Sequence, residues 1–498
     1  MGRFGRRVAS SSLAGSPAIE SRPSIVASSK NTQAVVIGSG PNGLAAAISL
    51  AEAGCQVRVF EAAATAGGGT RTEEVTLPGF RHDLGSAIHP LAVTSPFFER
   101  LPLQNFGLDW IHPDAPLAHP LDDGTAVMAE ASLDQTAEGL GVDRDRYIDL
   151  FAPLIESWPQ IRDDVLAPAR VPAHPLAMAR FGLSAAMPAS WLCRLRFGGH
   201  RARALFAGIA AHSTVPLSYA FSSAIGLVLG IAAHTVGWPL PKGGACSISE
   251  SMIRYLESLG GRVELNHPIA DLANVLRNDA ILCDLTPRQF ARIAAAHIPK
   301  AYARRLNRFR YGPGVFKVDW ALSQPIPWTA KECLRAATVH VGGQMEEIEA
   351  SEQAVWNGQH TDRPFVLLAQ PSLFDGTRAP HGKHTAWAYC RVPNGSQRNL
   401  LAVIESQIER FAPGFRDCVL ARKSWNCQEM EMWNSNLVGG DISGGALTAS
   451  QLFLRPNRHM YSTPIKNVFL CSSSTPPGPG VHGMCGFHAA ERAKRLLS

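Results

Sequence analysis

Three glycines and one acidic residue near the start of the chain have the spacing of a site that binds a dinucleotide. Gly38, Gly40 and Gly43 form the pattern G-x-G-x-x-G, and Glu61 follows about 20 residues later. In such a site the first glycine permits a tight turn, the second lets the main chain approach a pyrophosphate, and the third lets a helix pack closely on a strand. The acidic side chain accepts hydrogen bonds from ribose hydroxyls. These residues therefore predict a site for the ribose and pyrophosphate of a dinucleotide.

The elements that must position these residues can be recognised on both sides of the turn. Residues 34–37 are an apolar run typical of a buried parallel strand, residues 44–53 predict an alanine-rich helix, and residues 56–60 predict a second strand. Pro41 and Asn42 lie just before this helix, whose N-terminal N–H groups and positive dipole end attract phosphate. Because strand, turn, helix, second strand and acid follow in this order, we expect a βαβ unit.

Two further segments indicate which dinucleotide binds. Residues 67–72 (GGGTRT) resemble the flavoprotein pattern in which Gly-Gly-Arg follows the second strand and wraps the pyrophosphate, although Gly69 stands where that pattern has arginine. Residues 80–86 resemble the segment that passes near the flavin in the same proteins. The resemblance implies FAD rather than NAD, with a flexible glycine loop as the alternative for residues 67–69. The cofactor contacts that it implies here are Gly67, Gly68, Gly69, Arg71, Gly85 and Ser86.

Residues 35–90 and 467–490 resemble the phytoene desaturase and carotenoid isomerase superfamily of flavoproteins, and the resemblance covers nearly the whole chain after residue 31. Residues 76–80, 311–320 and 481–486 match more closely the subgroup of pyridine nucleotide-disulfide oxidoreductase domain-containing protein 2. This resemblance implies an α/β fold with two domains. One is a discontinuous Rossmann-like FAD-binding domain with a central parallel sheet and a β-meander, and the other is an inserted α+β substrate domain.

The domain boundaries follow from this resemblance and from the order of the expected elements. The FAD-binding domain is expected to comprise residues 31–115, 237–285 and 425–498, and the substrate domain residues 116–236 and 286–424. Residues 1–30 are rich in Arg and Ser, so that we expect a disordered extension or a transit-like leader.

The middle and the end of the chain are expected to return to the FAD-binding domain. A helix over residues 247–259 and strands over residues 263–265 and 280–284 are predicted, and the resemblance places Ile269 near the adenine. A strand over residues 467–471 and a helix over residues 487–497 are predicted around a glycine-rich loop.

The glycine-rich loop near the C-terminus closes over the flavin in the family, with Gly483 and Met484 as expected cofactor contacts. It repeats the spacing G-x-G-x-x-G at Gly478, Gly480 and Gly483. We do not expect an NAD(P)H site there, because no second strand and no ribose-binding acid follow it.

Catalytic residues are harder to assign, because a bound flavin performs the redox step itself. His482 is the candidate catalytic residue, with a histidine that orders its own loop as the alternative. His89 has the same two interpretations, whereas His212 and His234 are expected to be core histidines. Lys317 alternates with apolar residues in an expected strand and is predicted to face solvent. Trp238, Trp320 and Tyr389 could line a pocket or pack in a core.

Composition and charge exclude several classes of protein. A net charge of +6 with no basic run interleaved with aromatics argues against nucleic-acid binding. The 10 cysteines include no C-x-x-C pair and no cluster with zinc spacing, so neither a metal site nor a dithiol centre is expected. Residues 217–236 predict a buried helix rather than a membrane span. Residues 178–203 contain five arginines among apolar residues, which indicates either a membrane-contacting patch or a solvated helix face.

These observations predict an FAD-dependent oxidoreductase of the dehydrogenase or desaturase type, which transfers a hydride from an apolar substrate to the flavin. An isoprenoid is one option for this substrate. The alternatives are a flavin-dependent double-bond isomerase, an oxidoreductase of the amine oxidase type, and a mitochondrial interaction protein with little turnover. We expect a location in the cytoplasm or the mitochondrial matrix, with peripheral membrane contact as an option. The oligomeric state is not predicted.

Overall fold

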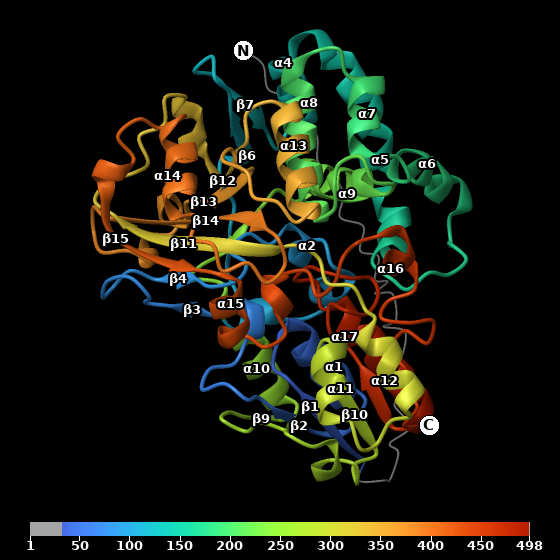
Figure 1. Cartoon of the computed structure of the whole chain (residues 1–498). Helices are drawn as coiled ribbons and strands as arrows, with labels where there is room; N and C mark the ends of the chain where they lie inside the picture. The colour runs from blue at the N-terminus through green and yellow to red at the C-terminus, as the bar shows by residue number, and fades with distance from the viewer. Residues whose placement is uncertain (1–31, 498) are drawn as a thin grey trace, which may run out of the picture. The chain divides into compact units, whose positions relative to one another are not determined.

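The computed structural model describes residues 32–497, which Figure 1 shows coloured along the chain. The expected leader over residues 1–30 lies outside the described residues. A five-stranded sheet takes its strands from both ends and the middle of the described chain, and a seven-stranded sheet takes its strands from the segments between them. This alternation agrees with a discontinuous domain and an inserted domain, whose boundaries stay predictions.

The five-stranded sheet is parallel, with the order β16-β10-β1-β2-β9. Its central strand β1 pairs with β10 on one side and with β2 on the other. The apolar β-branched residues of β1 favour such a place, because a central parallel strand is covered on both faces. The strands are β1 (Gln33–Ile37), β2 (Gln56–Phe60), β9 (Arg262–Glu264), β10 (Ala280–Cys283) and β16 (Val468–Leu470).

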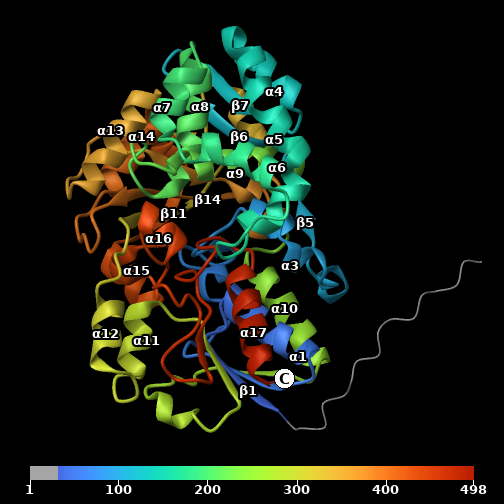
Figure 2. The ribbon, with the colours of Figure 1, turned by 90° about the vertical axis from the view of Figure 1, so that its right-hand side faces the viewer.

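Helices cover both faces of the parallel sheet. On one face α1 (Pro41–Glu52) packs against α10 (Cys246–Ser258) and α17 (Met484–Leu497), and Figure 2 shows α17 alongside α1. The other face packs against α11 (Pro287–Ile293) and α12 (Lys300–Asn307) through Phe290 and Tyr302. The predicted βαβ unit is therefore confirmed, and its first helix begins at Pro41, before the predicted residue 44.

The seven-stranded sheet has the order β15-β11-β14-β13-β12-β6-β7, and its neighbours are antiparallel except for the pair β12 and β6. Its strands are β6 (Ala115–Pro120), β7 (Ala126–Ala129), β11 (Gly314–Leu322), β12 (Ala336–Val341), β13 (Val366–Ala369), β14 (His384–Val392) and β15 (Val419–Trp425). Three consecutive strands of this sheet, β12, β13 and β14, are neighbours and antiparallel, so they form a β-meander within the residues predicted as the substrate domain. The described residues add two antiparallel pairs, β3 (Thr72–Glu73) with β4 (His82–Asp83) and β5 (Trp110–Ile111) with β8 (Leu240–Pro241).

The two faces of the seven-stranded sheet differ in polarity, because successive side chains point to opposite faces. One face is apolar and packs against α14 (Leu401–Glu409) through residues such as Val318, Leu368 and Ile404. The strand registers place a second set of residues together on the opposite face. We call this face the polar face, and its members are His119, Lys317, Asp319, Thr338, His340, Trp387, Tyr389 and Arg391.

Lys317 corrects a prediction, because it was expected to face solvent and is only 2% exposed. Its strand β11 lies inside the sheet, between β14 and β15, and not at an edge. Alternation along a strand tells which residues share a face, but it does not tell whether that face is covered. The neighbouring chain segments decide this.

A group of helices packs near the polar face. The predicted buried helix is confirmed as α9 (Ser222–Thr235), whose apolar side chains belong to the largest apolar cluster. Within residues 32–497 no helix is long and apolar enough to cross a membrane. The other long helices of this region are α5 (Arg144–Val165), α6 (Pro175–Ala185), α7 (Ala189–Arg196), α8 (His200–Ala210) and α13 (Met345–Trp356).

Candidate dinucleotide-binding site

The first glycine turn links β1 to α1 and leaves no space for side chains at two of its positions. Gly38 has φ of 100°, a left-handed conformation that favours glycine, and its N–H donates to the carbonyl of Phe60 at 2.8 Å. A Cβ atom on Gly43 would lie 2.1 Å from the Gly38 oxygen, and one on Gly40 would lie 2.5 Å from Asp284 Oδ2. The turn therefore needs glycine for close packing, as its spacing predicts.

Glu61 follows β2 and is bonded to this turn. Its Oε2 accepts hydrogen bonds from the Ser39 N–H at 2.9 Å and the Ser39 hydroxyl at 2.6 Å, and its Oε1 accepts one from the Ala63 N–H at 2.9 Å. The carboxylate thus lies beside the first turn, where the βαβ unit places a ribose. Ile269 packs in the cluster that includes Phe60, so the segment after β9 runs next to Glu61.

The second glycine turn, Gly67–Gly69, contacts the first. The Gly67 N–H donates to Ser39 Oγ at 3.1 Å, and a Cβ atom on Gly68 would lie 2.9 Å from the Gly40 Cα. At Gly69, in contrast, a Cβ atom would meet no other atom within 4 Å. The two turns therefore form one surface with open space beside Gly69.

Arg71 and the segment after β4 extend this surface. The guanidinium of Arg71 donates to the main-chain oxygens of Gly68 at 3.2 Å and of Trp433 at 2.9 Å, and it lies 4.3 Å from the centre of the Trp433 ring. Burial is the main reason why the pKa of Arg71 is lowered. The Ser86 N–H donates to the Gly69 carbonyl at 3.1 Å, and a Cβ atom on Gly85 would lie 2.0 Å from the same oxygen. The structure thus brings the predicted residues of both segments together.

The C-terminal loop packs directly on the start of α1. A Cβ atom on Gly486 would lie 1.8 Å from the Asn42 carbonyl, and one on Gly483 would lie 3.1 Å from the Ala45 side chain. Met484, the first residue of α17, is buried. Gly483 and Met484 therefore lie beside the first glycine turn, and their contact with a cofactor stays a prediction.

His482 has the contacts of a histidine that orders its own loop. Its Nδ1 accepts a hydrogen bond from the Met484 N–H at 3.0 Å, and its carbonyl accepts one from Ser95 Oγ at 2.6 Å. Burial lowers the pKa of His482 to about 4, so the ring is neutral near pH 7. These contacts match the alternative interpretation of the sequence, in which His482 orders its own loop. A catalytic role of His482 stays a prediction.

Asp284 is a site residue that the sequence patterns did not identify. It directly follows β10, the strand beside β1, and its Oδ2 accepts a hydrogen bond from the Gly43 N–H at 3.0 Å. Burial raises the pKa of this carboxyl to about 7; the bond from Gly43 lowers it, and the charge of Glu61 raises it further. An acidic residue at the end of a buried strand next to β1 is the signal that could have found it, because such strand ends meet at the ligand-binding edge of the sheet.

The polar face of the seven-stranded sheet lies next to the segment that leaves the second turn. Ala87, which follows Ser86, packs in one cluster with Trp387, and Ile88 and Tyr389 pack against that cluster. Lys317 Nζ donates to Asp319 Oδ1 at 2.5 Å and lies 5.3 Å from the centre of the Trp387 ring. The segment that leaves the second glycine turn is therefore in contact with the polar face.

Several atoms of the polar face have free hydrogen-bonding capacity. Within residues 32–497 the following buried atoms of this face have no hydrogen-bond partner: His119 Nδ1, Thr338 Oγ1, His340 Nδ1, Trp387 Nε1 and Arg391 Nη2. Buried polar atoms are normally satisfied by protein or by water. The polar face therefore offers donors and acceptors for water or for a bound molecule.

Of the other histidine and aromatic residues considered from the sequence, some lie near the polar face and others lie in the core. His212 Nε2 lies 3.0 Å from His340 Nε2, and His234 Nε2 lies 2.9 Å from the Tyr147 hydroxyl. His89 is buried, and its Nε2 has no hydrogen-bond partner within residues 32–497. Trp320 lies on the apolar face and is core. The Trp238 indole donates to the Leu229 carbonyl at 3.1 Å, and its ring contacts that of His212.

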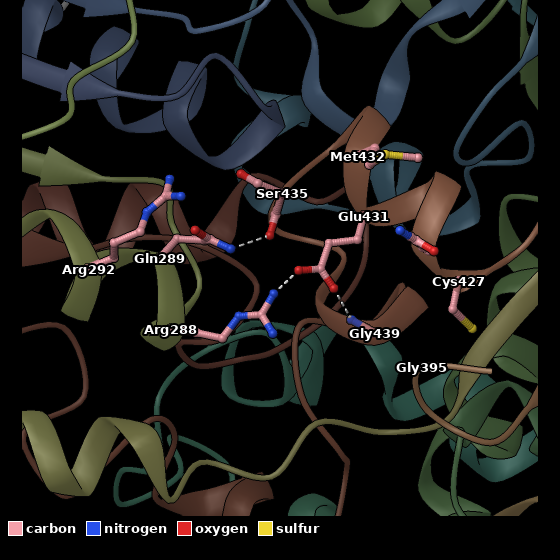
Figure 3. A pocket seen from close by; sticks show the side chains of 10 residues that line it. Arg288, Gln289, Arg292, Gly395, Cys427, Glu431, Met432, Ser435 and Gly439 are labelled. Atoms are coloured by element: carbon pink, nitrogen blue, oxygen red, sulfur yellow. Dashed lines mark hydrogen bonds and ion pairs between the residues drawn. The ribbon is translucent and has the colours of Figure 1, made fainter. Parts of the chain in front are cut away.

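A surface pocket of about 620 Å³ lies between α11 and α15 (Cys427–Trp433) and contains none of the predicted site residues. Figure 3 shows the Arg288 and Glu431 side chains paired across it, with Glu431 also accepting a hydrogen bond from the Gly439 N–H. Among residues 32–497 no group of His, Cys, Asp or Glu side chains could hold a metal ion.

The comparisons with known proteins agree with this geometry. Residues 36–101 match the family model of the NAD(P)-binding Rossmann-like domain. A mouse protein, pyridine nucleotide-disulfide oxidoreductase domain-containing protein 2, is 25% identical over an alignment that covers 93% of each chain. One of the limonene dehydrogenase subunits of Castellaniella defragrans is 33% identical over 28% of this chain and 25% of its own. An oxidoreductase of Methanosarcina mazei superposes with a TM-score of 0.63 at 16% identity, covering 93% of this chain and 100% of that one.

The fold and the site together define a dinucleotide-binding protein with the Rossmann-type fold of this group of oxidoreductases. The resemblance predicted from the sequence is confirmed, since the mouse relative matches over nearly the whole chain and a phytoene desaturase of Pseudescherichia vulneris matches over 49% of it at 21% identity. The predicted α/β fold class with a central parallel sheet is confirmed as well.

Proposed function

We propose that this chain is an FAD-dependent oxidoreductase of the dehydrogenase or desaturase type, in which an apolar substrate gives a hydride to the flavin. One observation carries the proposal: the two glycine turns contact each other beside the carboxylate of Glu61. This is the arrangement that holds the ribose and pyrophosphate of an adenine dinucleotide. Bound FAD would supply the hydride acceptor.

The residues present fit such a cofactor. Glu61 would accept hydrogen bonds from the ribose, and the main-chain N–H groups of the first turn would face the pyrophosphate. Arg71 is buried at the second turn, and both of its hydrogen bonds go to main-chain oxygens, so its charge suits an anion. Asn42 Oδ1 is buried at the first turn and has no partner within the described part of the chain. Gly85, Ser86, Gly483 and Met484 would contact the flavin half.

The polar face would form one wall of the substrate site. Ala87 and Ile88 connect the cofactor contacts to Trp387 and Tyr389, whose rings are stacked with an angle of 13° between their planes. Large aromatic side chains of this kind bury apolar molecules and exclude water. The Lys317–Asp319 pair stays inside this wall, where it orients Trp387 through the contact of Lys317 with the ring.

Two relatives support an apolar, isoprenoid-like substrate. One is the limonene dehydrogenase chain, and the other is the phytoene desaturase (lycopene-forming) of Pseudescherichia vulneris. A double-bond isomerase is the alternative for the same substrates. Amine oxidation is a second candidate function, because the Trp387 ring already accepts one cation, Lys317, on the polar face. A putrescine oxidase with the same fold superposes with a TM-score of 0.59 at 18% identity.

The test is to purify the protein, add excess FAD and record the visible spectrum of the bound flavin. Candidate terpenes, carotenoid precursors and amines are then added without oxygen. We expect a terpenoid hydrocarbon to bleach the flavin and to lose two hydrogens. Product of unchanged mass would favour the isomerase, and bleaching by amines alone would favour amine oxidation. Bound flavin that no substrate reduces would favour an interaction protein with little turnover, for which a mitochondrial location was one expectation.

We also propose that helices α6 and α7 touch a membrane surface, from which an apolar substrate can enter. Leu176 is 89% exposed and Leu183 is 76% exposed, and with Arg180 they lie along one face of α6. Trp191 and Leu195 of α7 are exposed as well. Exposed Leu and Trp beside arginine are typical of interfacial helices. Cosedimentation with anionic vesicles at low salt should be lost in Leu176→Ser/Leu183→Ser, and the absence of cosedimentation of the unaltered chain would contradict the proposal.

A further inference from the structure

Asp284 lies where an anionic ligand of the first glycine turn would be expected. Its Oδ2 accepts the hydrogen bond of the Gly43 N–H at 3.0 Å, and a Cβ atom on Gly40 would lie 2.5 Å from the same oxygen. The second glycine of such a turn normally gives its open side to a pyrophosphate. In this chain a carboxyl group of the protein lies on that side.

The surroundings of Asp284 do not favour a negative charge. The carboxyl is buried, and the Glu61 carboxylate on the other side of the turn has the same sign. The other titratable groups that face it are the thiols of Cys283, Cys471 and Cys485, all buried with raised pKa values and therefore neutral. Among the described residues the Gly43 N–H lowers the pKa of Asp284, and burial outweighs this effect.

A dinucleotide brings two more negative charges to the same N–H groups. Like charges a few ångströms apart in a poorly hydrated site cannot all remain ionised. The group whose charged form is stabilised least by hydrogen bonds takes up a proton. Within residues 32–497 the charged form of Glu61 accepts three hydrogen bonds, whereas the carboxyl of Asp284 accepts one. Asp284 is therefore the group that must change.

We propose that Asp284 couples cofactor binding to protonation: its carboxyl takes up one proton from solvent when FAD binds to the ionised form. The neutral carboxyl can then donate its O–H to a phosphate oxygen instead of competing for the Gly43 N–H. This inference rests on the proposed binding of FAD. It predicts that the affinity for FAD falls as the pH rises above the pKa of Asp284 in the free chain.

The experiment is a titration of the cofactor-free protein with FAD, followed by flavin fluorescence, from about pH 6 to about pH 8.5. For the unaltered chain the dissociation constant should be level below about pH 7 and should rise towards tenfold per pH unit above it. The Asp284→Asn side chain has the same shape without the charge. The FAD dissociation constant of this variant should therefore not change with pH, and at high pH it should be lower than that of the unaltered chain. Asp279→Asn is the matched control, because Asp279 is an aspartate at the other end of β10, and its variant should behave as the unaltered chain.

A second measurement does not depend on any variant. Calorimetric titration at about pH 8 in two buffers of different ionisation enthalpy gives the number of protons bound, for which we expect close to one per FAD in the unaltered chain. No proton uptake, or the same pH profile for the unaltered chain and Asp284→Asn, would overturn the role of Asp284 while FAD binding stands. If no FAD binds at any pH, both this inference and the proposed function fail.

Discussion

Lys317 and Asp319 form a hydrogen-bonded ion pair on the polar face, with 2.5 Å between Nζ and Oδ1 and almost no exposure of either side chain. They lie two residues apart on β11 and therefore point to the same side of the sheet. Asp319 Oδ2 also accepts a hydrogen bond from the Trp425 indole at 2.9 Å. The Asp319 carboxylate is therefore held by side chains of two neighbouring strands, β11 and β15.

Replacing Lys317 should destabilise the protein strongly. Lys317→Met leaves the Asp319 carboxylate buried without its cation, which costs about 3–5 kcal/mol for pairs of this kind. The double variant Lys317→Met/Asp319→Asn should lose less, because no charge is left unpaired. Urea unfolding measures both losses. Lys423→Met is the control, since Lys423 pairs with Glu429 at the surface and its loss should cost at most about 1 kcal/mol. Equal losses for Lys317→Met and Lys423→Met would contradict the prediction.

The open space beside Gly69 provides a test of the cofactor site. A Cβ atom there meets no neighbour within 4 Å, so Gly69→Ala should fold as well as the unaltered chain. If the dinucleotide occupies this space, the added methyl group should weaken FAD binding by about tenfold, which corresponds to about 1.4 kcal/mol. Thermal unfolding without FAD and a fluorescence titration with FAD separate the two effects. Gly139→Ala, which also meets nothing within 4 Å, is the control and should leave FAD affinity unchanged.

Asp284 should also govern how the stability of the cofactor-free chain depends on pH. Its folded pKa of about 7 lies above the ordinary value of 3.8, so the folded chain holds its proton more tightly than the unfolded chain. This contribution to stability is full at low pH and is lost as the pH rises to about 7. Asp284→Asn should therefore be more stable than the unaltered chain at about pH 8, by on the order of 2–4 kcal/mol. Equal unfolding midpoints of the two proteins at that pH would count against it.

His482 should act on stability more than on the pH dependence of catalysis. His482→Ala removes the acceptor of the Met484 N–H and should cost about 1–3 kcal/mol. Because burial lowers the pKa of His482 to about 4, the rate of flavin reduction should show no inflection from this residue near pH 6.5. Stopped-flow reduction over a range of pH measures this. An inflection near neutral pH that disappears in His482→Ala would restore it as a catalytic residue.

Mild acid should destabilise the fold through its buried histidines. Burial lowers the pKa of His82, His89, His119, His234 and His482 to about 4, so these rings are neutral in the folded chain. Their contribution is complete above the unfolded pKa of about 6.5 and is lost as the pH falls towards about 4. The melting temperature should therefore fall between pH 7 and pH 5, and more steeply in Asp284→Asn, which lacks the opposing contribution. A melting temperature that rises on acidification would refute this.

Much of the dinucleotide site could be predicted because its signals are local. Residues 34–61 contain a strand, a turn, a helix and a second strand in direct succession, and each is specified by its own residues. The same holds for α9, whose lack of charge predicts burial. The prediction that failed, the exposure of Lys317, concerned the relation of distant strands, about which local patterns say little.

The amino-acid sequence alone determined the βαβ unit, the glycine pattern at residues 38, 40 and 43, and the acid at residue 61, because the order and spacing of these residues are local. Only the tertiary structure decided that Asp284 meets Gly43, which lies 241 residues away, and that the polar face is assembled from four separate strands. The physical reason is that burial and neighbouring charge set the protonation of a carboxyl or an amine, and both come from chain segments that sequence spacing does not bring together.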